Sequence, residues 1–558
     1  MKIPYNVVHV SGSILFAARG GKIHSFGLDD GAHISTWKHP DVDKVDAAVK
    51  AISDEASSEK PVSQDPAVAE GEGSDEPPAK RQKVEDPKDE AVKETEQTED
   101  PDKQASGKKK GGKKSKNRNQ PRNKEQNISR VPDRPVVTHL TSTSDGSHVL
   151  AITGHDKAVW VFENDGKGNL TQLSKRFVVT GKRHLIHELT SVRTMPKRPS
   201  DVAIGPDSQI ICADKFGDVY ALPLLYDPES QAATSQPSTP GPAKPAYKPS
   251  ANATTVHSKR NLRALNNQQR QMELATRTKA ESESKAESPN FEISLLLGHV
   301  SMLTSLAIAE SEGRRYIITG DRDEHIRLSR YIPQAYVIEG FCFGHKEFIS
   351  SMTVPVPRGD VLVSGGGDED LFVWDWKAGK LLSRKSILSL AQEILPDLTK
   401  VAVSNLYTLV FPHEGTNLVY ILAICEGIPA IFSWQLTQEN TLNHPAVIQV
   451  PGNPLDLAVK PASGDESPKI IAALDPSDPT KAKSLAIYSL TMTDEKLATS
   501  TTALVSDEDV EAAELYVEEK VVKSLLYNTE NLRKQSEQED EQGEAQGAEV
   551  MADAEVAE

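Results

Sequence analysis

The segment from Gly344 to Asp375 constrains the fold of this chain more than any other feature. A Gly-His pair, Gly344-His345, is separated by 28 residues from a Trp-Asp pair, Trp374-Asp375. Just before the tryptophan, Gly365–Asp368 (three glycines and an aspartate) separates two short apolar runs. Glycine and aspartate in this position favour a tight turn between two strands. We therefore expect a small antiparallel sheet in this segment.

The spacing resembles the WD-repeat pattern of the β-propellers. In that pattern His345, a serine on the next strand, Asp368 and Trp374 form a buried hydrogen-bonded chain that pins one four-stranded blade. Fainter copies follow the order Asp, two residues, aliphatic, two residues, bulky. They occupy residues 20–26, 156–162, 214–220 and 323–329, and residues 431–434 and 485–488 keep only the strand. Seven copies predict an all-β fold, a seven-bladed WD-repeat β-propeller.

Two long polar stretches interrupt these repeats. Residues 39–133 contain an acidic stretch and a lysine-rich run, and residues 227–289 open with a proline- and serine-rich linker. Such compositions favour disorder over burial. The remaining sequence divides into blade 1 (residues 1–38), blades 2 and 3 (residues 134–226) and blades 4 to 7 (residues 290–502). We expect Ile3–Val10 to complete the last blade and lock the ring.

The end of the chain carries most of the formal net charge of −17. Acidic residues far outnumber basic ones from Asp507 to Glu558, so residues 503–558 are expected to form a short helix and a disordered acidic tail. Apolar residues at helical spacing within 509–534 could pack on the propeller or on a partner. We favour packing on the propeller.

Composition excludes several classes of protein. The three cysteines lie far apart, which excludes a disulfide framework and suits a reducing compartment. No apolar run approaches the ~20 residues of a membrane-spanning helix, and the start of the chain lacks the apolar core of a signal peptide. No phosphate-binding loop, nucleophile motif or metal-ligand cluster is apparent, so we expect no catalysis, cofactor or metal in this chain. These patterns indicate a soluble intracellular protein.

A short basic cluster in the first polar stretch bears on localisation. Lys80, Arg81 and Lys83 follow two prolines, as in a nuclear import signal, so we expect the protein in the nucleus. The lysine-rich run at residues 108–124 either supports the interpretation as an import signal or contacts RNA phosphates. Such RNA binding would be non-specific and weakened by salt. A stray basic patch is the alternative interpretation.

One blade departs from the repeat. The run GHVSML at Gly298–Leu303 leads to DRDEHIR at Asp321–Arg327, and Ser329 stands where most blades have a tryptophan. This combination is similar to the WD-repeat, non-catalytic subunit of the eukaryotic tRNA (guanine-7-)-methyltransferase. The resemblance spans most of the propeller but neither the inserts nor the tail. It implies a heterodimer in which a separate subunit binds S-adenosylmethionine and methylates a guanosine in the tRNA variable loop, while this chain docks and stabilises that subunit and helps to seat the tRNA.

The resemblance also implies a partner-binding residue. In this family the basic residue of the run pairs with a carboxylate of the catalytic subunit, and here that residue is Arg327. Further candidates share its turn or lie on loops of the same propeller face: Asp321, Arg322, Glu324, His325, Lys215 and Lys346. A solvated strand residue is the alternative reading of Arg327. We assign His299 and Asp323 to the hydrogen-bonded chain of their blade, as His345 and Asp368 are assigned in the next.

Two other classes of function stay open. A general nuclear scaffold for chromatin or ribosome-assembly partners would fit the acidic tail and the import-like signal equally well, and only the run DRDEHIR argues against it. An enzyme with a site in its central channel is the third reading. No carboxylate pair, metal cluster or cofactor motif in the sequence supports it.

Overall fold

The computed structural model describes residues 2–48, 134–172, 178–180, 183–185, 192–225 and 293–534, with short breaks between residues 465 and 515. The chain divides into two units, residues 1–47 with 133–558 and residues 48–132. All elements below belong to the first unit. The predicted insert at 227–289, most of the insert at 39–133 and the acidic end of the tail lie outside the described residues. So do Lys80, Arg81 and Lys83.

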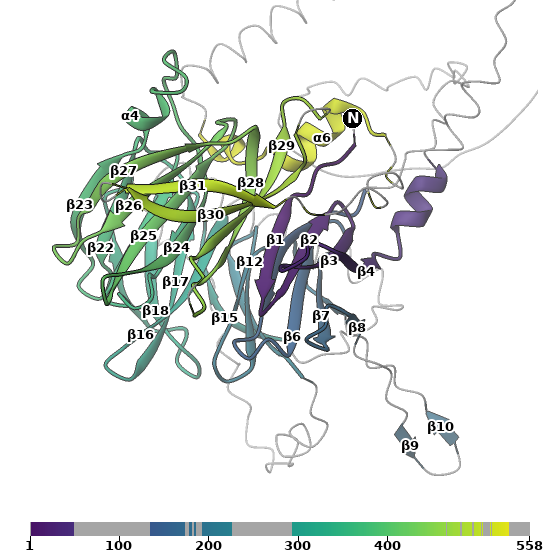
Figure 1. The fold of residues 1–558 in the computed structure, drawn as a ribbon. Coiled ribbons are helices and arrows are strands. Elements are labelled where there is room, and N and C mark those ends of the chain that lie inside the picture. The colour runs from purple at the N-terminus through teal and green to yellow at the C-terminus, as the bar shows by residue number, and fades with distance from the viewer. Residues whose placement is uncertain are drawn as a thin grey trace, which may run out of the picture. The chain divides into compact units, whose positions relative to one another are not determined.

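The described residues form seven antiparallel sheets of the kind expected for blades (Figure 1). Blade 1 consists of β1 (Val7–Ser11), β2 (Ile14–Arg19), β3 (Lys22–Gly27) and β4 (His33–Lys38). Blade 2 consists of β5 (Val137–Ser142), β6 (His148–Thr153), β7 (Ala158–Asn164) and β11 (Val192–Thr194), with the short β8 (Leu170–Gln172) also paired to β7. Blade 3 consists of β12 (Pro199–Ile204), β13 (Gln209–Asp214), β14 (Asp218–Pro223) and β15 (Ser294–Gly298).

The remaining blades follow in the second half of the chain. Blade 4 consists of β16 (Leu303–Ser311), β17 (Arg314–Asp321), β18 (Ile326–Arg330) and β19 (Ile338–Cys342). Blade 5 consists of β20 (Ile349–Thr353), β21 (Val361–Gly366), β22 (Asp370–Asp375) and β23 (Lys380–Ser386). Blade 6 consists of β24 (Val403–His413), β25 (Thr416–Cys425), β26 (Ala430–Leu436) and β27 (Leu442–Gln449), and blade 7 of β28 (Gly452–Lys460), β29 (Lys469–Pro476), β30 (Leu485–Thr493) and β31 (Lys496–Ala503). A separate hairpin pairs β9 (Val178–Thr180) with β10 (Arg183–Leu185), and the short α4 (Leu388–Ala391) leads from blade 5 to blade 6.

The seven sheets close into a ring. Each inner strand contacts the next, in the order β1, β5, β12, β16, β20, β24, β28 and back to β1. One buried apolar cluster lies between each neighbouring pair of blades. Because both faces of a blade are covered in this way, second strands such as β2 and β21 are buried along their whole length. The seven-bladed β-propeller is therefore confirmed.

Ring closure differs from the prediction. Ile3–Val10 does not complete the last blade: β1 pairs with β2 inside blade 1, and blade 7 takes all four of its strands from Gly452–Ala503. The reason is local, since β1 and β2 are joined by only two residues and Gly12 has a φ of 61°, which a tight hairpin favours. The seam between blades 7 and 1 is held by side chains instead. The amide of Val8 donates to Asp456 (2.8 Å) and that of Tyr5 donates to Ser484 Oγ (3.0 Å).

Two predicted domain boundaries also shift. Strand β15 pairs with β14, so residues 294–298 belong to blade 3 rather than to blades 4 to 7, and the second polar stretch falls inside blade 3. Residues 39–48 are ordered rather than part of a disordered insert, because His39, Val42 and Val45 are buried.

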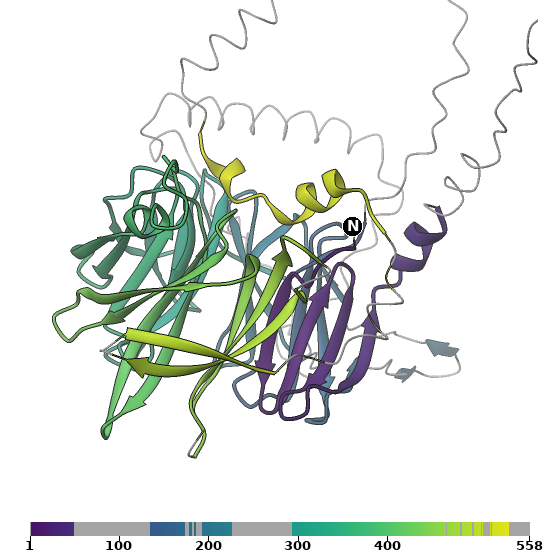
Figure 2. The same ribbon diagram turned by 45° about the horizontal axis from the view of Figure 1, so that its top comes forward.

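The C-terminal segment crosses one face of the ring (Figure 2). Helix α6 spans Glu519–Leu526, a short helix within the predicted stretch 509–534, and the 3-10 helix η2 spans Glu530–Leu532. This segment packs on the propeller, as expected. We call Glu519–Lys534 the strap and the face that it crosses the strap face. No helix within the described ranges is both long and apolar enough to span a bilayer.

Candidate functional site

Blade 5 holds its four signature side chains in the predicted order. The imidazole of His345 contacts Asp368 Oδ2 through Nδ1 (2.8 Å) and Ser364 Oγ through Nε2 (2.7 Å). The indole of Trp374 donates to the same Ser364 Oγ at 2.8 Å. Trp374 is fully buried and stacks on Phe372, with ring centroids 5.7 Å apart. This chain ties the loop before β20 to β21 and β22, and it fixes the blade at the strap face.

Blade 2 links the same kinds of side chain in a different order of contacts, and its histidine, His39, had been placed in the insert by the sequence analysis. The chain consists of His39, Thr153, Asp156 and Trp160. His155 lies beside it, so that ligand atoms of His39, His155 and Asp156 come within 4.8 Å of one another. His39 uses both ring nitrogens in hydrogen bonds, Nε2 with Asp156 (3.0 Å) and Nδ1 with the amide of Asp41 (3.1 Å). We therefore read the cluster as part of the hydrogen-bonded frame of the blade.

Blade 4 uses a different aspartate from the one predicted. Nε2 of His299 contacts Thr319 Oγ1 (2.9 Å), and Nδ1 lies 3.4 Å from the carboxylate of Asp321. The assignment of this role to Asp323 was wrong. Asp321 is buried, and its Oδ1 also accepts the amides of Asp323 (2.9 Å) and His325 (3.0 Å), which shapes the turn between β17 and β18. Asp323 instead turns its carboxylate toward Lys534, at 3.3 Å.

The electrostatics of this turn follow from that geometry. Burial opposes ionisation of Asp321, but hydrogen bonds from His299 and His325 outweigh it and hold the pKa of this carboxyl well below its usual range. The same hydrogen bond with Asp321 raises the pKa of His325, whose side chain is 42% exposed. A cation is thus favoured at the surface of the turn, above a buried carboxylate.

Arg327 lies one strand position below the turn. It is paired with Thr319 on β17, as Phe372 is paired with Ser364 in blade 5, so Arg327 takes the place of Phe372. By the same register Ser329 takes the place of Trp374. The guanidinium donates to Ser329 Oγ (3.1 Å) and to the carbonyl of Gly298 (2.9 Å), and the residue is 8% exposed. The solvated alternative for Arg327 does not hold.

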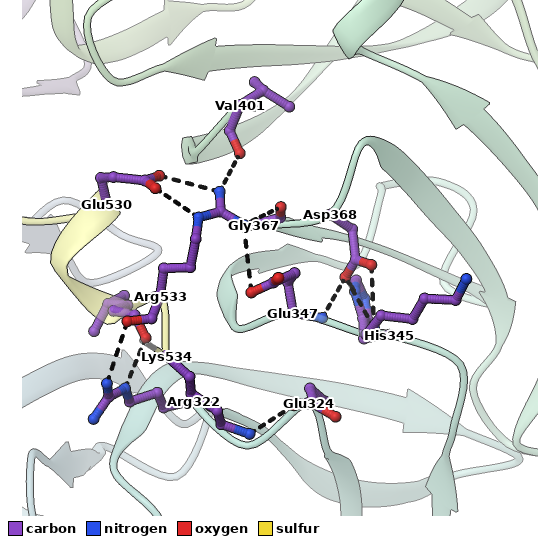
Figure 3. Close-up of polar contacts among 12 residues, drawn as sticks. Arg322, Glu324, His345, Glu347, Gly367, Asp368, Val401, Glu530, Arg533 and Lys534 are labelled. Carbon is purple, nitrogen blue, oxygen red and sulfur yellow. Dashed lines mark hydrogen bonds and ion pairs between the residues drawn. The ribbon is translucent and has the colours of Figure 1, made fainter. Parts of the chain in front are cut away.

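The turn itself is bound by the strap (Figure 3). Arg322 donates from Nε to the carbonyl of Leu532 at 2.7 Å, and from Nη2 to the carbonyl of Arg533 at 3.5 Å. Lys534 pairs with Glu324 at 2.6 Å. Two of the predicted partner-binding residues, Arg322 and Glu324, therefore already bind another part of the same chain.

An exposed aromatic pair lies beside the turn, and the sequence reading did not single it out. Phe341 and Phe343 are 36% and 64% exposed, and their rings stack with centroids 5.3 Å apart. His325 meets Phe343 edge-on at 5.8 Å. The available signal was the alternation Phe341-Cys342-Phe343, in which the cysteine is buried and both aromatic rings point outward.

The last two predicted partner-binding residues lie farther along the strap face. Lys215 is exposed in the turn between β13 and β14, and it lines a cavity of about 390 Å³ whose wall also includes strap residues such as Leu525 and Leu532. Lys346 is exposed in the loop before β20, where its amide contacts Asp368 (3.1 Å). Binding of a partner by these residues stays a prediction, as does nuclear import through Lys80, Arg81 and Lys83.

Comparison with known sequences adds independent information. The family described as "tRNA methyltransferase TRM82 WD40 domain" matches residues 15–184 and 177–499. A relative from Sclerotinia sclerotiorum is 37% identical over 470 residues, which cover 82% of this chain and 81% of the relative. One from Phaeosphaeria nodorum is 42% identical over 340 residues (57% and 63%), and one from Aspergillus oryzae is 34% identical over 453 residues (80% and 75%).

All three relatives are named as tRNA (guanine-N(7)-)-methyltransferase non-catalytic subunits of the Trm82 type. The family match includes blades 4 and 5 and the turn at Asp321–His325. This chain belongs to the Trm82 family, the WD40 non-catalytic subunits of tRNA (guanine-N(7)-)-methyltransferase.

Proposed function

We propose that this chain docks and stabilises the catalytic subunit of a heterodimeric tRNA (guanine-N(7)-)-methyltransferase. The partner would be a separate protein that binds S-adenosylmethionine and methylates a guanosine in the tRNA variable loop. Family membership supports the complex. The chemistry of blade 4 supports the place of docking.

The proposal rests on one difference between equivalent positions of two blades. Blade 5 has Phe372 and Trp374 where blade 4 has Arg327 and Ser329. Withdrawing a guanidinium from water is costly, and an apolar side chain of similar volume is often at least as stable in such a place. A blade that keeps an arginine 8% exposed there therefore gains something other than stability. A carboxylate of the partner that reaches this position would form a charge-assisted hydrogen bond in a site shielded from water.

The surroundings of Arg327 suit an interface. Phe341 and Phe343 offer apolar area at its edge, and His325 adds a second group that favours positive charge. Tightly bound interfaces place aromatic and arginine anchors at their centre and exclude water around them. Blade 4 therefore fits an acidic, partly apolar surface of the catalytic subunit.

The direct test replaces Arg327 with Glu in a chain co-expressed with its methyltransferase. Removing one member of a buried charge pair costs about 2–5 kcal/mol, so affinity should fall by ~30-fold or more. Co-purification and formation of 7-methylguanosine in tRNA should both be lost. Arg315→Glu is the matched control, because Arg315 lies on the same blade at the opposite end of β17 and is 40% exposed.

A second variant tests the same interface in case the Arg327→Glu variant misfolds. Phe343 is 64% exposed, so Phe343→Asp should leave the melting temperature unchanged while it weakens the complex by about tenfold. An intact, active complex with both variants would overturn the proposal. Loss with Arg315→Glu as well would mean that the effect is not specific to the strap face.

A further inference from the structure

Among the strands that the structure describes, none is shared between the first and last blades, yet the C-terminal segment reaches across the strap face (Figure 2). Before the strap begins, Glu514 pairs with Lys22 of blade 1 at 2.6 Å. Tyr527 donates to Asp475 of blade 7 and accepts from Asn453, and the amide of Thr529 donates to Glu426 of blade 6 at 2.6 Å. The strap therefore adds bonds to blades 6 and 7 beyond the contacts between neighbouring blades.

Arg533 is the centre of this attachment (Figure 3). Its guanidinium donates to the carbonyl of Gly367 in blade 5 (2.9 Å) and to the carbonyl of Val401 at the entry to blade 6 (3.0 Å). It also lies 3.3 Å from the carboxylate of Glu347 and 5.4 Å from the centre of the Phe348 ring. The side chain is 11% exposed. Charge-assisted bonds to two blades at so low an exposure are expected to hold firmly.

The strap ends on the turn that carries the docking candidates. Arg322 gives two hydrogen bonds to the carbonyls of Leu532 and Arg533, and Lys534 pairs with Glu324 and Asp323. Glu324 has a φ of 74°, a backbone conformation that a glutamate adopts at some cost. The ion pair with Lys534 (2.6 Å) therefore attaches the strap at a backbone position that is already constrained.

We propose that the strap is a clasp that holds the Arg322–His325 turn in the geometry required to dock the catalytic subunit. The strap accepts hydrogen bonds from Arg322 and pairs its Lys534 with Asp323 and Glu324. It leaves His325, Phe341 and Phe343 exposed. The turn is therefore already ordered before the partner binds, so binding does not have to offset the entropy cost of ordering it. The inference rests on the proposed function for the identity of the partner, but the ordering of the turn is a property of the free chain.

The experiment uses the full chain with Arg533→Ala and Lys534→Ala combined. Amide hydrogen exchange of Asp323 and His325 is measured in the free chain, because both amides are hydrogen-bonded to Asp321 within the turn. Affinity for the purified methyltransferase is measured in parallel. We expect exchange of both amides to accelerate at least tenfold and affinity to fall by about tenfold or more.

Arg358→Ala is the matched control. Arg358 also joins blades 5 and 6, because it donates to the carbonyl of Thr437 (3.1 Å) and to Asn440. It lies just before β21, at the end of the strand opposite to Gly367, which Arg533 contacts. Its replacement should lower the melting temperature without changing exchange at the turn or affinity for the partner. The control separates loss of a bond between blades from loss of the clasp.

The outcomes are distinct. Unchanged exchange in the double variant would overturn the clasp whatever the partner does. Faster exchange with unchanged affinity would overturn the role of the strap in docking. Faster exchange with higher affinity would also overturn it, and would make the strap a cover that the partner displaces. If the unaltered chain does not bind the methyltransferase while its turn depends on the strap, the proposed function fails and the clasp alone survives.

Discussion

Blades 4 and 5 are neighbours built to the same plan, and they differ in the aspartate that their histidine contacts and in one pair of side chains on the third strand. Both open with Gly-His, both pair their strands in the same register, and both join the histidine to a hydroxyl on the second strand. Blade 5 then stacks Phe372 on the fully buried Trp374, whereas blade 4 places Arg327 and Ser329 there. The difference teaches that the histidine and hydroxyl suffice to keep the blade, while the aromatic pair can be exchanged for a cation.

The largest effect is expected when the buried tryptophan of blade 5 is removed. Trp374→Ala deletes a fully buried ring and leaves Ser364 without its indole donor, so the free energy of unfolding should fall by roughly 3–5 kcal/mol. Ser329→Ala in blade 4 removes only a hydroxyl that accepts from Arg327, and should cost about 1–2 kcal/mol. Urea unfolding of both variants measures the gap. Equal losses would mean that the aromatic pair is no anchor.

A milder change would turn blade 4 into a copy of blade 5. Arg327→Phe combined with Ser329→Trp replaces a buried cation by apolar rings and should leave the free energy of unfolding unchanged or raise it by about 1–2 kcal/mol. Thermal and urea unfolding check this, and the same protein should no longer bind the methyltransferase. The reverse pair in blade 5, Phe372→Arg with Trp374→Ser, should destabilise the chain. A blade 4 that unfolds on conversion would show that Arg327 is needed for the fold rather than for docking.

The same two blades show how far the sequence could predict the structure. Blade 5 was read correctly because His345, Asp368 and Trp374 are large or charged residues at fixed spacings, and each has one evident role. Blade 4 was misread in one respect: Asp323 stands six residues before Ser329, as Asp368 stands six before Trp374, yet Asp321 reaches His299. Spacing along a turn does not reveal which of two nearby carboxylates bends inward.

Contacts between distant parts of the chain were harder to predict. Lys534 lies 210 residues from Glu324, and no local pattern around either residue announces the pairing. The closing strand was expected from the general design of propellers, and the two-residue turn at Gly12, which keeps β1 within blade 1, was overlooked. Local periodicity therefore predicted the blades, while the closure of the ring and the strap depended on tertiary contacts.

The subtlest test concerns pH and separates the turns of the two blades. His325 in blade 4 corresponds to Asp370 in blade 5, and histidine is the side chain whose ordinary pKa lies near neutral pH. The groups that face His325 are Asp321, Asp323 and Glu324, and together they raise its pKa. Because the folded chain holds this proton more tightly than the unfolded chain, the contribution to stability is fully present below the unfolded pKa of about 6.5 and is lost as pH rises through the raised folded pKa.

His325→Gln should therefore lower the melting temperature at about pH 5.5 and leave it unchanged near pH 9. Asp321 stays ionised across this range because its pKa is depressed, so the loss at high pH belongs to the histidine alone. The effect should be small, since the His325 side chain is 42% exposed and solvent screens the pair. Phe343→Leu is the control, because it changes the ring that meets His325 without changing a titratable side chain, so its effect should be the same at the two pH values. A His325→Gln effect that is equally large at both would show that the histidine acts through its shape against Phe343 rather than through its charge.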